Sequence, residues 1–122
     1  IWGAPARQPD HALRAARAGL ALHAAVERVA SIDWPRFRVG INTGPALVGN
    51  IGAAQMRNYT AIGDTVNLAA RLQDLALPGQ VVLGPGTALA LGEAARLSGH
   101  RRVRVKGKRD PIRICVLEEI RR

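Results

Sequence analysis

Residues 39–72 read VGINTGPALVGNIGAAQMRNYTAIGDTVNLAARL, and this stretch decides the fold. Apolar and polar residues alternate at its start, which predicts a half-buried strand over residues 37–42. Shorter extended pieces are expected over residues 46–52 and 57–62. The glycine and aspartate that follow open a helix, which we expect over residues 63–75. Its apolar positions wrap broadly, as in a helix that packs between other elements.

The flanking segments supply the remaining elements. An alanine-rich amphipathic helix is predicted over residues 10–30. A short strand over residues 80–83 precedes a short helix over residues 85–91. Two antiparallel strands are expected over residues 97–106 and 112–117, joined by a glycine- and proline-containing turn. This order of elements predicts an α+β sandwich rather than a doubly wound sheet.

Length and composition bound the class of protein. The 122 residues suit one domain, residues 1–122, and a hydrophobic fraction of 48% is too high for a disordered chain. No apolar run reaches the roughly 18–20 residues that cross a bilayer, so we expect no membrane contact by this domain. Cys115 is the only cysteine, which excludes an internal disulfide and fits a reducing, cytoplasmic location. The start at Ile1 resembles the middle of a domain, and we expect further residues of the same domain before it.

The charge is strongly positive, with a formal value of +9 at pH 7. Much of the excess lies in residues 96–113, a segment that suits nucleic acid, an acidic partner or a polyphosphate substrate. A solvated strand face is the alternative. Aromatic residues make up only 3% of the chain, which argues against a stacking platform for single-stranded nucleic acid.

Asn67 and Arg71 are the polar residues most suggestive of a site. They are four positions apart and therefore project from one face of the predicted helix, among apolar neighbours. An amide can orient a hydroxyl group, and a guanidinium can meet phosphate oxygens with a planar fork. From spacing alone, Arg71 could equally pair with a carboxylate of the same protein, and Asn67 could cap a nearby loop.

Several motifs together resemble the catalytic domain of the class III adenylate and guanylate cyclases. They are VGINTG at 39–44, VGNIG at 48–52, YTAIGDTVNLAARL at 59–72, WGAP at 2–5 and VKGK at 105–108. The resemblance covers essentially the whole chain. It implies a ferredoxin-like-type sandwich of a mixed, mainly antiparallel sheet with helices, lacking the first strands of the cyclase domain.

The resemblance also implies roles for individual residues. Asn67 matches the asparagine that orients the ribose, and Arg71 matches the arginine that stabilises charge on the transferring phosphoryl group. Lys106 matches a lysine that contacts the terminal phosphates. Thr60 stands at the base-selecting position, as in a subclass of bacterial adenylate cyclases, and the backbone of Ala61 lies where it can touch the purine. A threonine hydroxyl can donate and accept, which favours ATP.

Cofactor and partner follow from the same resemblance. The family uses two aspartates to hold Mg²⁺ or Mn²⁺, and both would lie before Ile1, so no metal ligand is expected in this chain. We read Asp64 as a helix cap. We expect a head-to-tail homodimer that shares each ATP site between two chains, no specific nucleic acid, and no turnover by these 122 residues alone. The alternatives are a guanylate cyclase, a non-catalytic cyclase-like nucleotide-binding or regulatory domain, and a nucleic-acid-binding module.

Overall fold

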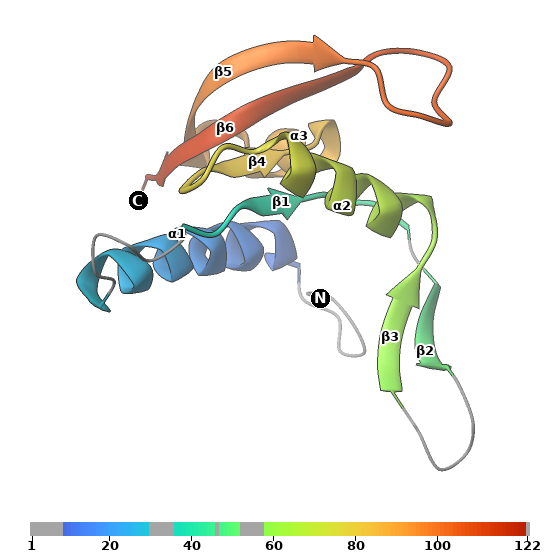
Figure 1. Ribbon diagram of the computed structural model, residues 1–122, viewed down its shortest axis with the longest axis horizontal. Helices are drawn as coiled ribbons and strands as arrows, with labels where there is room; N and C mark the ends of the chain where they lie inside the picture. The colour runs from blue at the N-terminus through green and yellow to red at the C-terminus, as the bar shows by residue number, and fades with distance from the viewer. Residues whose placement is uncertain (1–8, 30–35, 46, 52–57, 122) are drawn as a thin grey trace.

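The computed structural model describes residues 9–29, 36–45, 47–51 and 58–121. Figure 1 shows a sheet with helices on both faces and a two-stranded arm that projects from one end. In chain order the elements are α1 (His11–Val29), β1 (Val39–Ile41), β2 (Leu47–Ile51), β3 (Asn58–Ile62), α2 (Asp64–Leu75), β4 (Val81–Leu83), α3 (Pro85–Leu91), a 3₁₀ turn (Gly92–Ala94), β5 (Ala95–Val103) and β6 (Ile112–Ile120).

The main sheet has four strands in the order β1-β4-β6-β5. The first pair is parallel, with Val39 opposite Val81 and Ile41 opposite Leu83. The pairs β4–β6 and β5–β6 are antiparallel. The predicted α+β class and the mixed, mainly antiparallel sheet are therefore confirmed.

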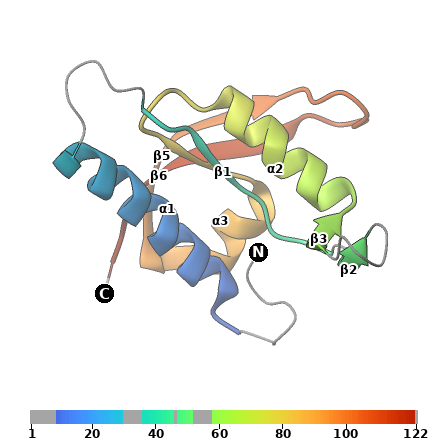
Figure 2. The same ribbon diagram turned by 60° about the horizontal axis from the view of Figure 1, so that its bottom comes forward.

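Two apolar clusters hold the layers together, one on each face of the sheet. Val81 and Leu83 of β4 join Ala12 and Ala16 of α1 in one cluster. Val82, between them in sequence, joins the opposite cluster with α2. Successive strand residues point to opposite faces, so β4 is buried on both sides. The sheet is consequently the middle layer, with α1 on one face and α2 on the other, and β1 passes between the two helices in Figure 2.

Close packing of α2 on β1 depends on Gly40. A Cβ atom at this position would lie 2.6 Å from the carbonyl oxygen of Ala69 and would also overlap the backbone nitrogen of Gln73. Both are backbone atoms of α2, which cannot move aside as the end of a side chain can. The glycine therefore sets the distance between helix and strand.

The arm is an antiparallel hairpin of β2 and β3. Its register runs from Leu47 opposite Ile62 to Ile51 opposite Asn58. The arm points away from the layered body, and β3 returns directly to the start of α2 (Figures 1 and 2). The backbone of residues just before α2 is thereby placed at one end of the sheet. Residues 2–5, on which part of the resemblance rests, lie outside the described residues.

Some predicted boundaries differ from the structure. Strand β1 begins at Val39, and Phe37 precedes it with 53% of its surface exposed, so the half-buried strand predicted over residues 37–42 was placed two residues too early at its start. The carbonyl oxygen of Phe37 accepts a hydrogen bond from the backbone of Gly79, at the turn that precedes β4. Strand β5 starts at Ala95, earlier than expected, because the 3₁₀ turn leads directly into it.

Candidate functional site

An exposed polar stripe runs along α2. Asp64, Asn67, Arg71 and Asp74 follow one another at intervals of three and four residues, and all four are exposed. This spacing places them on one side of the helix. The buried residues Leu68 and Leu72 belong to the side that packs on the sheet. The prediction that Asn67 and Arg71 share one helix face is therefore confirmed, and that face is open to solvent.

The side chains of Asn67 and Arg71 are not engaged within the part of the chain that the structure describes. Neither makes a hydrogen bond or an ion pair with a described residue, although Asp74 lies only three positions after Arg71. The internal pairing that spacing alone left open is thus not formed among these residues. A guanidinium and an amide held one turn apart remain available to a phosphate and a sugar hydroxyl.

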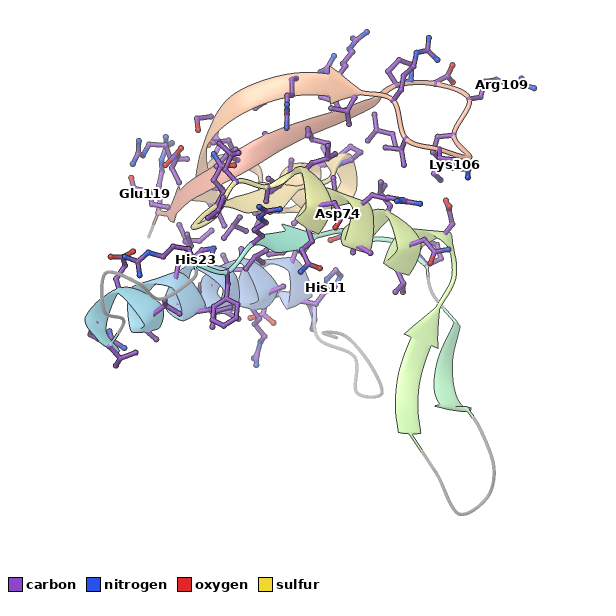
Figure 3. All side chains as sticks on the ribbon, viewed as in Figure 1. His11, His23, Asp74, Lys106, Arg109 and Glu119 are labelled. Carbon is purple, nitrogen blue, oxygen red and sulfur yellow. The ribbon has the colours of Figure 1, made fainter. Side chains whose placement is uncertain are left out.

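The loop between β5 and β6 carries Lys106 and lies beside the start of α2. Val105 is buried in the same cluster as Leu68, which anchors the loop on the α2 side of the sheet. Gly107 adopts a positive φ of 90°, and the backbone nitrogen of Lys108 donates to the carbonyl oxygen of Val105 at 3.0 Å. This tight turn leaves Lys106 exposed at the edge of the loop that faces α2, as Figure 3 shows.

An ion pair joins this loop to the helix. The ammonium group of Lys108 contacts the carboxylate of Asp64 at the first residue of α2. The interpretation of Asp64 as a helix cap was wrong, because Gly63 occupies the capping position and no side chain caps this end. The carboxylate instead binds the neighbouring loop. The pair therefore holds the loop that carries Lys106 at the end of α2 where Asn67 lies.

The turn after β1 holds α2 from its other side. The side-chain nitrogen of Asn42 donates to the backbone carbonyl oxygen of Thr65 at 2.9 Å. A Cβ atom at Gly44 would lie 2.7 Å from the hydroxyl oxygen of Thr65, so a larger residue there would require the Thr65 side chain to move. The motif VGINTG thus fixes the first turn of α2 through Asn42 and Gly44. Sequence reasoning gave these residues no role, although the glycine signalled close backbone approach.

Thr60 and Ala61 lie on β3, shortly before α2. Their backbones pair with Gly49 and Val48 of β2. Nothing is described of their side chains. Their assignment to base selection and purine contact remains a prediction, and they lie four and three residues, respectively, before the first residue of α2.

The described residues do not form a metal centre. No group of three or more His, Cys, Asp or Glu side chains within them is arranged to hold an ion. Asp64, the carboxylate at the start of α2, is paired with Lys108. The described residues therefore do not fit Mg²⁺ or Mn²⁺, and the aspartates expected before Ile1 stay a prediction.

Other features lie away from α2. A shallow hollow lined by Arg17, Leu20, Glu119 and Ile120 contains none of the predicted site residues. Cys115 is buried in the cluster beneath α1, and burial raises the pKa of its thiol, as expected of a structural cysteine. Among the described helices, none is long and apolar enough to cross a membrane.

Comparison with known proteins identifies this arrangement. Residues 1–119 match the family described as the adenylate and guanylate cyclase catalytic domain. Adenylate cyclase 1 of Rhizobium meliloti is 39% identical over 97 residues, which cover 74% of this chain and 15% of that protein. The guanylate cyclase soluble subunit beta-2 of Rattus norvegicus is 34% identical over 112 residues, covering 88% of this chain and 16% of that protein.

Solved structures give the same result. The adenylyl cyclase CyaB from P. aeruginosa superimposes with a TM-score of 0.88 at 30% identity, covering 99% of this chain and 66% of that one. The guanylyl cyclase Cya2 superimposes with a TM-score of 0.82 at 34% identity, covering 98% and 64%. The chain thus spans about two-thirds of these structures and a much smaller share of the curated relatives. Both adenylate and guanylate cyclases occur among them.

Proposed function

The chain belongs to the adenylate and guanylate cyclase catalytic domain family, and on this premise we propose that it forms the ribose- and phosphate-binding half of an adenylate cyclase site. The observation that carries the proposal is the open pair of Asn67 and Arg71 on α2, with the Lys106 loop attached to the same end of that helix. These are the groups that a nucleoside triphosphate needs around its sugar and phosphates.

The reaction is attack of the ribose 3′ hydroxyl on the α-phosphate of ATP, which gives 3′,5′-cyclic AMP and releases pyrophosphate. The Asn67 amide orients the ribose, so that the attacking oxygen is held in line. The Arg71 guanidinium stabilises the negative charge that develops on the transferring phosphoryl group. Lys106 binds the terminal phosphates, which become the leaving group. The described residues offer no ligand set for a metal ion, so the roles assigned are those of these three side chains alone.

Base choice rests on Thr60. Its hydroxyl can donate and accept, which suits the amino group and ring nitrogen of adenine. Relatives of both specificities resemble this chain, so the preference for ATP over GTP is the part of the proposal that most needs a measurement. A guanylate cyclase is the competing function, and a non-catalytic nucleotide-binding or regulatory domain is the second.

A shared site completes the proposal. The exposed α2 stripe carries binding and charge-stabilising groups, whereas metal ligands are expected in the segment before Ile1. We therefore propose a head-to-tail homodimer, in which one chain presents Asn67 and Arg71 and its partner would present the aspartates expected to hold Mg²⁺ or Mn²⁺. The domain itself is proposed to be cytoplasmic.

The test uses a longer protein that includes the residues before Ile1. Replacing Arg71 by alanine is expected to lower cyclic AMP formation by about 10²–10³-fold, the usual effect of removing one transition-state donor. Gln73→Ala, an exposed change on the same helix away from the stripe, is the matched control and should keep full activity. ATP and GTP are supplied in parallel. Undiminished activity of Arg71→Ala, or equal use of GTP, would contradict the respective part of the proposal.

A further inference from the structure

Two contacts attach the Lys106 loop to α2. The first is apolar: Val105 packs in the cluster that contains Leu68 and Leu72. The second is the ion pair of Lys108 with Asp64. Lys106 lies between these two attachments in the sequence. Its position relative to α2 is therefore set by a buried valine on one side and a charge pair on the other.

The two lysines of this turn have different surroundings. Lys108 has 32% of its side chain exposed and meets a carboxylate, whereas Lys106 is exposed and makes no ion pair with a described residue. Gly107 separates them with its positive φ of 90°, which an L side chain rarely adopts. The turn thus directs one ammonium group to the protein and leaves the other for a ligand.

The position of Asp64 links this pair to the proposed site. Asp64 begins the exposed stripe of α2, one turn before Asn67 and two turns before Arg71. An exposed ion pair contributes little to overall stability. The Asp64–Lys108 pair is instead expected to fix the position of the loop, because it joins the loop to the helix that bears Asn67 and Arg71.

We propose that the Asp64–Lys108 pair is a positioning device that holds Lys106 over the start of α2 and so sets the affinity for the terminal phosphates of the substrate. Asp64 and Lys108 act through Lys106 and are positioning residues. The inference rests on the proposed function, since it assigns a phosphate ligand to Lys106. It differs from a direct role of Lys108, in which that ammonium group itself would bind phosphate.

The experiment separates positioning from direct contact. Asp64→Asn, Lys108→Gln and the double variant are made in the longer protein, with Lys108→Arg as the conservative variant. Each single change is expected to raise the KM for ATP about threefold to tenfold, which corresponds to a loss of roughly one unit in log Kd or less for the phosphates. The kcat should stay within about twofold, because Lys106 itself is unchanged. The double variant should be no worse than either single one, since both remove the same pair. Lys108→Arg keeps the positive charge and should leave the KM for ATP close to that of the unaltered protein.

A binding measurement makes the result independent of turnover. Inorganic tripolyphosphate is titrated into each variant by calorimetry, and AMP is titrated as a ligand without terminal phosphates. Positioning predicts weaker tripolyphosphate binding in both single variants and unchanged AMP binding. Arg109→Gln is the matched control, because it removes one positive charge from the same loop at a side chain that points away from the loop (Figure 3). This variant should change the binding of neither tripolyphosphate nor AMP.

Three outcomes would overturn the inference. Asp64→Asn could leave the KM and tripolyphosphate binding unchanged, or Lys108→Gln could act equally in the Asp64→Asn background, which would indicate direct phosphate contact. A parallel loss of AMP binding would indicate a general structural role. Absence of cyclase activity in the unaltered protein would contradict the proposed function instead, and the tripolyphosphate titrations would still decide the role of the pair.

Discussion

The two long helices lie on opposite faces of one sheet and bury themselves in different ways. Helix α1 packs through small residues, since Ala12, Ala15, Ala16 and Gly19 are all buried. Helix α2 packs through two leucines and leaves a polar stripe open to solvent. Small residues form most of the buried face of α1, whereas two leucines are the buried side chains of α2, whose backbone also lies against Gly40 of β1. The proposed site therefore lies on the long helix that buries fewer of its residues.

The largest change in stability is expected at Leu72, a residue of α2 that is fully buried between the helix and the sheet. Leu72→Ala should lower the free energy of unfolding by about 2–5 kcal/mol, through lost burial and the cavity that remains. Arg71→Ala, at the adjacent but exposed residue, should change it by less than about 0.5 kcal/mol. Urea unfolding of both variants measures the contrast. A substantial loss of unfolding free energy in Arg71→Ala would mean that the polar stripe of α2 stabilises the fold in addition to its proposed role in the site.

A smaller effect separates two glycines at helix–sheet contacts, Gly40 of β1 against α2 and Gly19 of α1 against β4. Gly40→Ala meets helix backbone and should cost about 1–3 kcal/mol of unfolding free energy, as overpacking does. Gly19→Ala would place its Cβ 3.3 Å from a methyl group of Val81, a side chain that can shift. Because alanine also favours a helix by up to about 1 kcal/mol, the net change at Gly19 should be close to zero. Equal losses at both positions would show that the α1 contact is as rigid as the α2 contact.

The sequence pattern predicted the elements best where a proline or a glycine marks the end of an element. The short helix from Pro85 to Leu91 was predicted with its observed bounds, because proline favours the first turn of a helix and Gly92 ends this one with a positive φ. The helix that became α2 was expected within one residue at its start. In β5, register irregularities between Arg96 and Leu97 and again before Arg101 interrupt the alternation that marks a strand.

The candidate site was predictable only within each element. The spacing of Asn67 and Arg71 is a property of one helix, so the sequence contains it. The contacts that fix this helix join distant positions: Asn42 and Thr65 are 23 residues apart, and Asp64 and Lys108 are 44 apart. The periodicity of the sequence does not reveal such pairs, because they form only when the sheet brings two distant loops to one end of α2. The misreading of Asp64 as a cap has the same cause.

The smallest effect is expected on the α1 side, at the exposed pair of Asp10 and Arg14. The guanidinium of Arg14 donates to the Asp10 carboxylate at 2.9 Å and lowers the pKa of that carboxyl below its ordinary value of 3.8. Because the pKa is lower in the folded state, ionised Asp10 favours folding at pH values above 3.8, and this contribution disappears as the pH falls through the lowered value. The stability difference between the unaltered protein and Asp10→Asn, followed by urea unfolding from pH 6 to pH 2, should therefore shrink toward acid. A difference that grows toward acid would show that the carboxyl is held in its protonated form, and a constant difference would show that the pair does not report on folding.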